Sequence, residues 1–260
     1  MPANAAMLTL IGGPTLLIEL AGFRLLTDPT FDGPGEYHLP HVTLRKTSEP
    51  AIAVNEIGPI DAVLLSHDQH SDNLDTSGRA YVRDAVRTIT TVAGAGRLGG
   101  ASEGLAPWTE TALTKSGHRL VITATPARHG PAGIEPFSGD VIGFILRCDD
   151  EDAIYVTGDT VWFDGTAEVA RRFTPRVVVL FAGAARSRGP FSLTMNTNDT
   201  LETAHAFPSA TIVPVHYEGW AHFSESRSDL EKSFDALGVR SRLKVLEPGV
   251  ATEVRLTEPT

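Results

Sequence analysis

Apolar residues in this chain gather in short runs that glycine, proline and acidic residues interrupt. A short run that is continuously apolar or β-branched predicts a buried strand, because a helix needs a longer segment with a period near 3.6 residues. The segments that predict strands are residues 8–11, 15–20, 23–27, 61–65, 88–93, 109–113, 118–125, 141–146, 153–156, 177–181, 211–215 and 243–246.

Longer segments with amphipathic spacing predict helices. Their apolar positions recur at the spacing of one helix face, so each helix is expected to cover a sheet. In the first of them Arg79, Arg83 and Arg87 recur every fourth residue and predict a solvated face. The segments that predict helices are residues 77–87, 161–173, 198–207 and 228–237.

Two segments have neither period. Residues 31–60 hold many prolines, glycines and histidines, and residues 94–100 are rich in glycine. Both predict loops. A loop as long as residues 31–60 is often functional in a compact domain, so we expect it to cover a site.

The order of these elements predicts the architecture. Strands dominate both ends of the chain, helices are interspersed in each half, and no linker, repeat or low-complexity segment stands out. The simplest arrangement is an α/β protein with one domain over residues 1–260. Its two sheet-plus-helix halves would pack their sheets face to face, with the helices outside.

Composition and charge restrict the class of protein. An apolar content of 42% and a charged content of 21% are typical of a globular protein in water. The net charge of −10 and the absence of a Lys/Arg block argue against tight binding to a nucleic-acid backbone. Cys148 is the only cysteine, which excludes an intrachain disulfide and a cysteine-based zinc site. We find no signal peptide and no apolar run near the ~20 residues of a membrane span, so we expect a cytoplasmic protein.

Residues of metal-ligand type follow four of the predicted strands. The carboxyl ends of strands are where open α/β sheets place their sites, so these side chains are expected to converge. Imidazole and carboxylate groups suit zinc, and a catalytic zinc needs about three of them and an open position for water. These residues are enough to bind one ion, or two ions that share a carboxylate. The residues are His67, His70 and Asp72 after residues 61–65, His129 after 118–125, Asp159 after 153–156, and His216 after 211–215.

Each of these residues alone also has a structural explanation. Asp159 follows Gly158 and could be a turn residue or a helix cap, and Asp72 or Asp75 could cap the helix that follows. Four such coincidences at four strand ends nevertheless favour a shared metal site.

With these motifs in view, the chain resembles the metallo-β-lactamase-fold hydrolases, which share an HxHxDH motif. It looks like the branch of ascorbate-phosphate lactonases and N-acyl-phosphatidylethanolamine phospholipases, and the similarity runs the whole length. The resemblance implies a four-layer αβ/βα sandwich. The segments that carry it are residues 15–19 with 26–29, 65–68 with 72–75, 125–129, 157–160 and 214–217.

The resemblance also implies the roles of the ligands. His67, His70 and His129 would hold a first ion. Asp72, Asp159 and His216 would hold a second, with Asp159 bridging the two. The expected cofactor is Zn²⁺, as one or two ions, with Mn²⁺ or Fe as alternatives.

The chain departs from the family pattern at three places. Two residues, Asp68 and Gln69, separate the first two histidines where the family has one. Asn73 stands where a histidine is expected, and residues 12–14 read Gly-Gly-Pro where the branch often has a Gly-His pair. An amide carbonyl is a weak zinc ligand, so we expect a weaker second site, unless Asp68 or Gln69 enters the shell.

The predicted activity is hydrolysis of an ester, lactone or phosphodiester in a small-molecule substrate by a metal-bound hydroxide. Asp72 is expected to orient that water or take its proton, and His222 to contact the substrate or protonate the leaving group. Arg128 could pair with an anionic substrate group or form a structural salt bridge. Two alternatives stay open. One is a non-catalytic metal-binding or sensing protein with a degenerate second site, and the other is a nuclease of the same fold, which the negative charge disfavours.

Overall fold

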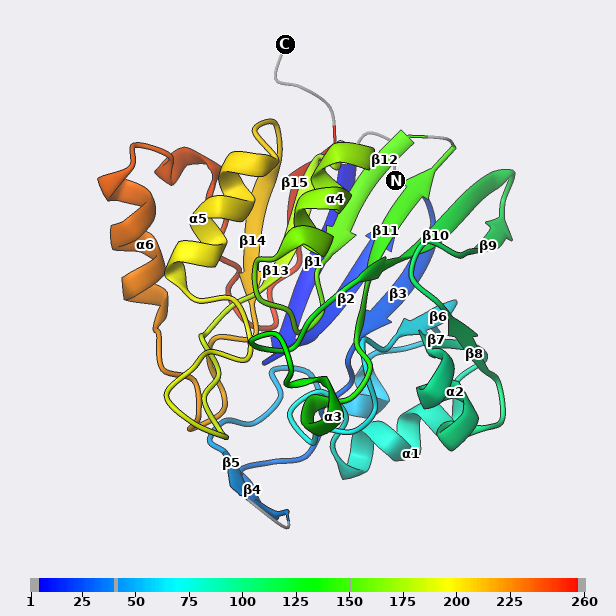
Figure 1. The fold of residues 1–260 in the computed structure, drawn as a ribbon. Helices are drawn as coiled ribbons and strands as arrows, with labels where there is room; N and C mark the ends of the chain where they lie inside the picture. Colours follow the sequence, from blue (N-terminus) through cyan, green and yellow to red (C-terminus); the bar gives the residue numbers. More distant parts are fainter. Residues whose placement is uncertain (1–4, 40–41, 150, 257–260) are drawn as a thin grey trace.

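The computed structural model describes residues 5–39, 42–149 and 151–256 (Figure 1). A seven-stranded mixed sheet has the strand order β15-β1-β2-β3-β6-β7-β8. Its strands β3, β6, β7 and β8 run parallel, and β15, β1, β2 and β3 pair antiparallel. The bounds are β1 Ala5–Gly12, β2 Thr15–Leu20, β3 Phe23–Thr27, β6 Ala62–Leu64, β7 Thr88–Thr91, β8 Ser102–Leu105 and β15 Thr252–Arg255.

A six-stranded sheet lies against the first and has the order β14-β13-β12-β11-β10-β9. Strands β12, β13 and β14 are parallel, and β9 to β12 are antiparallel neighbours. A separate hairpin of β4 Gly35–His38 and β5 Thr43–Lys46 projects beyond the sheets. The bounds in the six-stranded sheet are β9 Glu110–Lys115, β10 His118–Pro126, β11 Ile142–Cys148, β12 Glu151–Val156, β13 Val177–Phe181 and β14 Thr211–Val215.

The two faces of β13 show how the core is divided. Every residue of this strand is fully buried. Val177, Val179 and Phe181 pack in the cluster between the two sheets, whereas Val178 and Leu180 pack on the opposite face beneath the helices. Alternation with period two therefore builds two cores from one apolar run.

Helices form the outer layers. On the six-stranded sheet, the side chains of Val169, Ala204 and Phe234 bring α4, α5 and α6 into the outer core. On the seven-stranded sheet, Val82 of α1 packs against Val63 and Leu65. The predicted four-layer αβ/βα sandwich is confirmed (Figure 1). The helix bounds are α1 Thr76–Asp84, α2 Val92–Leu98, α3 Glu135–Ser138, α4 Asp164–Arg172, α5 Thr197–Ala206 and α6 Arg227–Ala236, with 3₁₀ turns η1 Val54–Glu56 and η2 Arg240–Arg242.

Three predictions about elements were wrong. The segment 31–60 contains the β4–β5 hairpin and η1, and residues 94–100 lie mostly in α2, which β8 follows. Residues 243–246 are not a strand, because only Leu243 forms an isolated bridge, with Ile212. The edge position of the first sheet belongs instead to β15, which pairs with β1.

Strand direction sets the place of the site. The strands β6, β10, β12 and β14 all end at the lower edge of the sheets as drawn in Figure 1, and the loops that follow them meet there. Within the described residues, every helix is too short or too polar to cross a membrane.

Candidate metal centre

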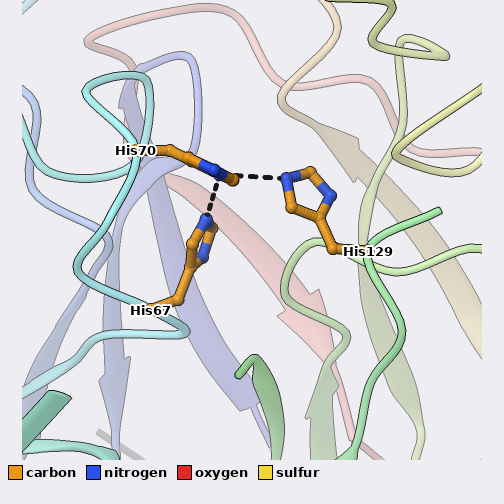
Figure 2. Close-up of side chains that lie close together, drawn as sticks. All are labelled: His67, His70 and His129. Carbon is orange, nitrogen blue, oxygen red and sulfur yellow. Dashed lines mark hydrogen bonds between the residues drawn. The ribbon is translucent and has the colours of Figure 1, made fainter. Parts of the chain in front are cut away.

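Three imidazoles converge at the edge where β6 and β10 end. His67 Nε2 lies 2.9 Å from His70 Nδ1, and His129 Nε2 lies 3.1 Å from the same atom (Figure 2). Two nitrogen ligands of a tetrahedral zinc ion, each at 2.0–2.1 Å from the metal, would lie about 3.3 Å apart. The three nitrogens are therefore spaced like ligands of one ion, and His70 presents Nδ1 where the other two present Nε2.

Neighbouring oxygens fix how these rings are turned. His129 Nδ1 donates to the backbone oxygen of Leu193 at 2.8 Å. Ser66 Oγ donates to Asp28 Oδ1 at 2.7 Å and so accepts from His67 Nδ1 at 2.9 Å. In both rings the proton lies on Nδ1, which leaves the Nε2 lone pair facing the centre.

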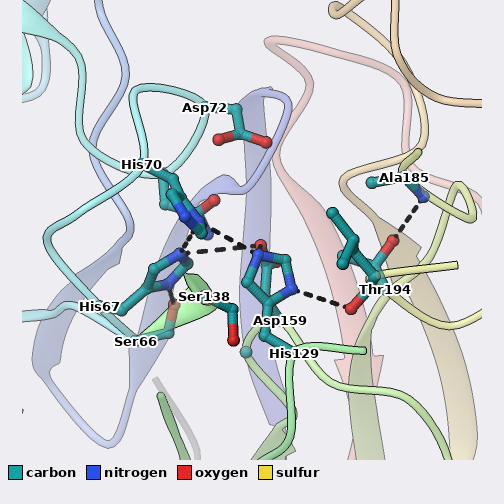
Figure 3. A network of polar contacts seen from close by, with 12 residues as sticks. Ser66, His67, His70, Asp72, His129, Ser138, Asp159, Ala185 and Thr194 are labelled. Carbon is teal, nitrogen blue, oxygen red and sulfur yellow. Dashed lines mark hydrogen bonds and ion pairs between the residues drawn. The ribbon is translucent and has the colours of Figure 1, made fainter. Parts of the chain in front are cut away.

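A second group of donors lies beside the first. Asp159 Oδ1 is 3.4 Å from His216 Nδ1, and Asp72 Oδ2 is 3.7 Å from His216 Nε2. The other oxygen of Asp159, Oδ2, is 3.4 Å from His129 Nε2 and 3.9 Å from His67 Nε2. Asp159 therefore stands between the two groups with one oxygen toward each, as a bridging carboxylate would. Figure 3 shows Asp159 beside the three histidines of the first group.

The donors fit a metal because their buried atoms lack other partners. Both carboxylate oxygens of Asp159 and both ring nitrogens of His216 are buried and make no hydrogen bond within the described residues. Leaving such groups unpaired is costly in a folded protein, so each unpaired atom calls for an explanation. Divalent cations would satisfy them, one held by His67, His70 and His129 and a second held by Asp72, Asp159 and His216.

The electrostatics favour neutral imidazoles in the first donor group, His67, His70 and His129, and an ionised carboxylate at Asp72. Burial lowers the pKa of His70 and of His129 to about 4 and lowers the pKa of His67 well below its usual value. Burial would raise the pKa of Asp72, but the neighbouring imidazoles of His216 and His222, the second of them hydrogen-bonded to Asp72, hold it well below its usual value. Uncharged rings keep their lone pairs for a cation, and the Asp72 carboxylate supplies negative charge.

The departures from the family pattern have a structural explanation. Asp68 is turned away from the donors and pairs with Arg97, whose Nε lies 2.8 Å from Asp68 Oδ2. Asn73 is fully buried, and its Nδ2 faces Asp28 Oδ1 at 3.5 Å. Burial raises the pKa of Asp28 to about 8, against hydrogen bonds from Ser66 that lower it. Asn73 therefore offers its amide to a carboxyl group behind the metal donors.

Residues outside the donor set also reach the centre. His222 Nε2 lies 2.9 Å from Asp72 Oδ2, so the structure places it at the cluster. Arg128 makes no ion pair among the described residues, and its guanidinium lies 4.7 Å from the centre of the Phe163 ring.

Asp28 was not predicted, although it follows a predicted strand just as the ligands do. Arg188 lines the cavity over the donors and lies in a loop without periodicity, so no signal in the sequence identified it.

Comparison with known proteins identifies the family of the chain. The family model described as the β-lactamase superfamily domain matches residues 23–217, which is most of the chain. The chain belongs to the β-lactamase superfamily. Together with the fold, this makes it a metal-dependent hydrolase of the metallo-β-lactamase type, as the sequence predicted.

Other members of the superfamily match nearly the full chain. The UPF0173 protein YddR of Bacillus subtilis is 27% identical over 251 residues, which cover 93% of this chain and 97% of the relative. A UPF0173 metal-dependent hydrolase of Herpetosiphon aurantiacus is 26% identical over 96% of this chain and 98% of its own.

Solved structures of the superfamily share the fold. An isothiocyanate hydrolase from Delia radicum gut bacteria superposes with a TM-score of 0.82 and 26% identity, covering 95% of this chain and 98% of its own. A possible metal-dependent hydrolase from Veillonella parvula superposes with a TM-score of 0.83 at 21% identity, covering 98% of this chain and all of its own.

Proposed function

We propose that this superfamily member hydrolyses an ester, lactone or phosphodiester bond in a small molecule, as the branch that it resembles would. The observation that carries the proposal is the pair of adjoining donor groups with Asp159 between them. The mixture of imidazole and carboxylate donors suits zinc, and Mn²⁺ or Fe are the alternatives.

The metal supplies the activation. When bound, a zinc ion would lower the pKa of a coordinated water to about 7 and polarise the oxygen of the scissile group. His67, His70 and His129 would hold one ion, and Asp72, Asp159 and His216 would hold a second.

The protein supplies the proton path. The ionised Asp72 accepts from His222 Nε2 at 2.9 Å, which keeps one proton of His222 on that atom. Asp72 would orient the attacking water or take its proton, and His222 would pass that proton to the leaving group. The water oxygen then bonds to the substrate carbon or phosphorus as the bond to the leaving group breaks.

A second candidate reaction is hydrolysis of an isothiocyanate, the activity named for the protein from Delia radicum gut bacteria. The cavity over the donors favours it, because apolar side chains of Leu39, Val42 and Leu44 line one wall and suit an uncharged organic group.

The test combines metal analysis with a substrate panel of esters, lactones, phosphodiesters and isothiocyanates. Turnover should disappear with a chelator and return with Zn²⁺ or Mn²⁺. His129→Ala and Asp159→Ala should lose both metal and activity, whereas His205→Ala, at an exposed histidine of α5, should keep both. Retained metal in either of the first two variants would contradict the ligand assignment.

The proton path is tested separately. His222→Gln should keep its metal content and lose about 10²- to 10⁴-fold in kcat, the usual contribution of a positioned general acid or base.

Full metal occupancy without turnover across the panel would favour the non-catalytic alternative. Binding of RNA at low salt would favour the nuclease.

A further inference from the structure

The cavity over the metal donors has two unlike walls. Leu39, Val42 and Leu44 line it from the β4–β5 hairpin, and Ala185, Arg188 and Leu193 line it from the loop after β13. The donors His70, Asp72 and His129 form its floor, together with His222. Among the described residues, the hairpin wall is therefore apolar, and the other wall carries a cation.

The loop that carries Arg188 starts from a fixed base. Leu193 N donates to Ala185 O at 2.8 Å, and Thr194 Oγ1 accepts from Ala185 N at 3.0 Å (Figure 3). Arg186 N donates to His222 O at 2.9 Å. These bonds hold the loop beside the donors, so Arg188 extends from a positioned backbone.

Arg188 has no acidic partner. Its Nη2 donates to the Phe137 backbone oxygen at 3.2 Å, and it makes no ion pair among the described residues. By contrast, Arg87, Arg97 and Arg147 each pair with a carboxylate. In a chain with a net charge of −10, a cation that faces the reaction centre without a counter-ion is available for an anion from outside.

The size of the cavity indicates where a substrate enters. Its volume of about 30 Å³ has room for roughly two water molecules, so the attacking water fits and a substrate must displace part of a wall. Leu44, Ala185 and Leu193 are buried, whereas Arg188 is exposed and Leu39 and Val42 are half-buried. Arg188 is the most exposed of these side chains, so it can move to admit a substrate more readily than the buried Leu44, Ala185 or Leu193.

We infer that the substrate carries an anionic group, of carboxylate or phosphate type, separate from the bond that is cleaved, and that Arg188 binds this group while the apolar part of the substrate contacts the β4–β5 hairpin. This inference rests on the proposed hydrolase function and names the substrate class for the same site. The planar guanidinium can donate two parallel hydrogen bonds to such a group, which sets the orientation of the substrate as well as its affinity.

The first experiment compares two esters on the zinc-loaded protein. They are p-nitrophenyl butyrate, which is neutral, and the mono-p-nitrophenyl ester of glutaric acid, which ends in a carboxylate. Arg188→Gln should raise KM for the anionic ester about 10- to 100-fold, the size of a charge-assisted hydrogen-bond pair, with little change in kcat. It should leave the KM for the neutral ester unchanged. For the anionic ester, the KM of Arg188→Lys should lie between those of the unsubstituted protein and Arg188→Gln.

Arg186→Gln is the matched control. It removes the same charge from an exposed arginine two residues away that does not line the cavity. It should change neither ester. If the two substitutions raised the KM for the anionic ester equally, the effect would come from net charge and not from binding by Arg188, and the inference would be overturned.

A second experiment needs no turnover. Calorimetry compares glutarate with its monoamide, glutaramate, which keeps one carboxylate for the metal and replaces the other with a neutral amide. The zinc-loaded protein should prefer glutarate, and Arg188→Gln should lose that preference. No preference in the unsubstituted protein overturns the inference and leaves the hydrolase proposal standing. If the unsubstituted protein prefers glutarate and Arg188→Gln does not, but no substrate is turned over, the hydrolase proposal is overturned and the anion site remains.

Discussion

At the scale of single residues, a chain of polar contacts runs from a buried carboxyl group to a metal donor. Asp28 accepts from the backbone nitrogen of Ser66 at 2.9 Å and from its hydroxyl at 2.7 Å, and that hydroxyl faces His67 Nδ1. A partner behind a metal-binding imidazole fixes its tautomer and direction. Ser66 therefore acts as a positioning residue for His67.

Ser66→Ala tests this contact. The variant removes the oxygen that holds the Nδ1 proton of His67, so zinc affinity should fall about 10- to 100-fold, the usual effect of losing such a partner. Competition with a chromophoric chelator measures it. Ser209→Ala, at an exposed residue of the turn before β14, should leave the affinity unchanged. An unaltered affinity in Ser66→Ala would mean that packing alone orients the ring.

The strand-end rule predicted that the candidate donors converge, but not their geometry. It placed His67, His129, Asp159 and His216 together because four strands end at one edge, and the structure brings these residues together. It could not predict that His70 presents Nδ1, since that depends on the path of the two intervening residues. It also could not predict Arg188, because no period marks the loop after β13.

At the scale of elements, the N-terminus of α1 ties the β4–β5 hairpin to the metal loop. Asp75 accepts from Gly78 N at 2.8 Å as the helix cap, and from Lys46 Nζ at 3.1 Å in a buried ion pair. Asp32 accepts from Ser77 N at 3.0 Å and from Tyr37 OH at 2.8 Å. Of the two caps considered from the sequence, Asp75 is the one observed.

Asp32→Asn is expected to destabilise the protein in a pH-dependent way. Burial would raise the pKa of Asp32, but hydrogen bonds from Ser77 and Tyr37 lower it below its usual value. The native state therefore binds this proton more weakly than the unfolded state, so the stabilisation is complete above the unfolded pKa near 4 and is lost as pH falls through the native pKa. The free energy of unfolding of the variant should be about 1 kcal/mol lower at pH 7, a difference that partial exposure of Asp32 to solvent keeps small.

Urea unfolding at pH 7 and at pH 3.5 measures this difference. The gap between the unsubstituted protein and Asp32→Asn should narrow at the lower pH. Asp164→Asn, at an exposed acid in the first turn of α4, should differ little from the unsubstituted protein in free energy of unfolding at either pH. A gap that does not depend on pH would show that the charge of Asp32 is unimportant.

The elements that the sequence did not predict are those that distant contacts stabilise. The hairpin is fixed by Thr47 N to Gly219 O at 2.8 Å and by Ala221 N to Arg45 O at 2.9 Å. No local pattern in residues 31–60 encodes partners so far along the chain. By contrast, the run Val177–Phe181 is apolar throughout because both of its faces are buried, and it was predicted with its exact bounds.

At the scale of the whole molecule, the candidate metal donors come from both sheets. His67, His70 and Asp72 follow β6 of the seven-stranded sheet, whereas His129, Asp159 and His216 follow β10, β12 and β14 of the six-stranded sheet. An ion bound to both sets would connect the two halves of the sandwich. Its binding free energy would then contribute to global stability.

Zinc is therefore expected to raise the free energy of unfolding. At a free concentration about 100 times the dissociation constant, the increase should be about 2.7 kcal/mol for one site. Thermal unfolding with zinc and with a chelator measures it. Asp159→Ala should lose the increase, and His205→Ala should keep it. A zinc-independent unfolding temperature in the unsubstituted protein would contradict a connection between the halves.

The pairing of β15 with β1 has a consequence for how the polypeptide can be rearranged. Ala5 and Arg255 are directly paired residues on neighbouring strands, so a short linker can join them. New ends can then be opened at the exposed turn of Ser116 and Gly117, between β9 and β10. Such a circular permutant would keep each candidate metal donor directly after its own strand. We therefore expect it to fold to the same architecture, because the architecture depends on which strands are neighbours and not on the order in which they are synthesised.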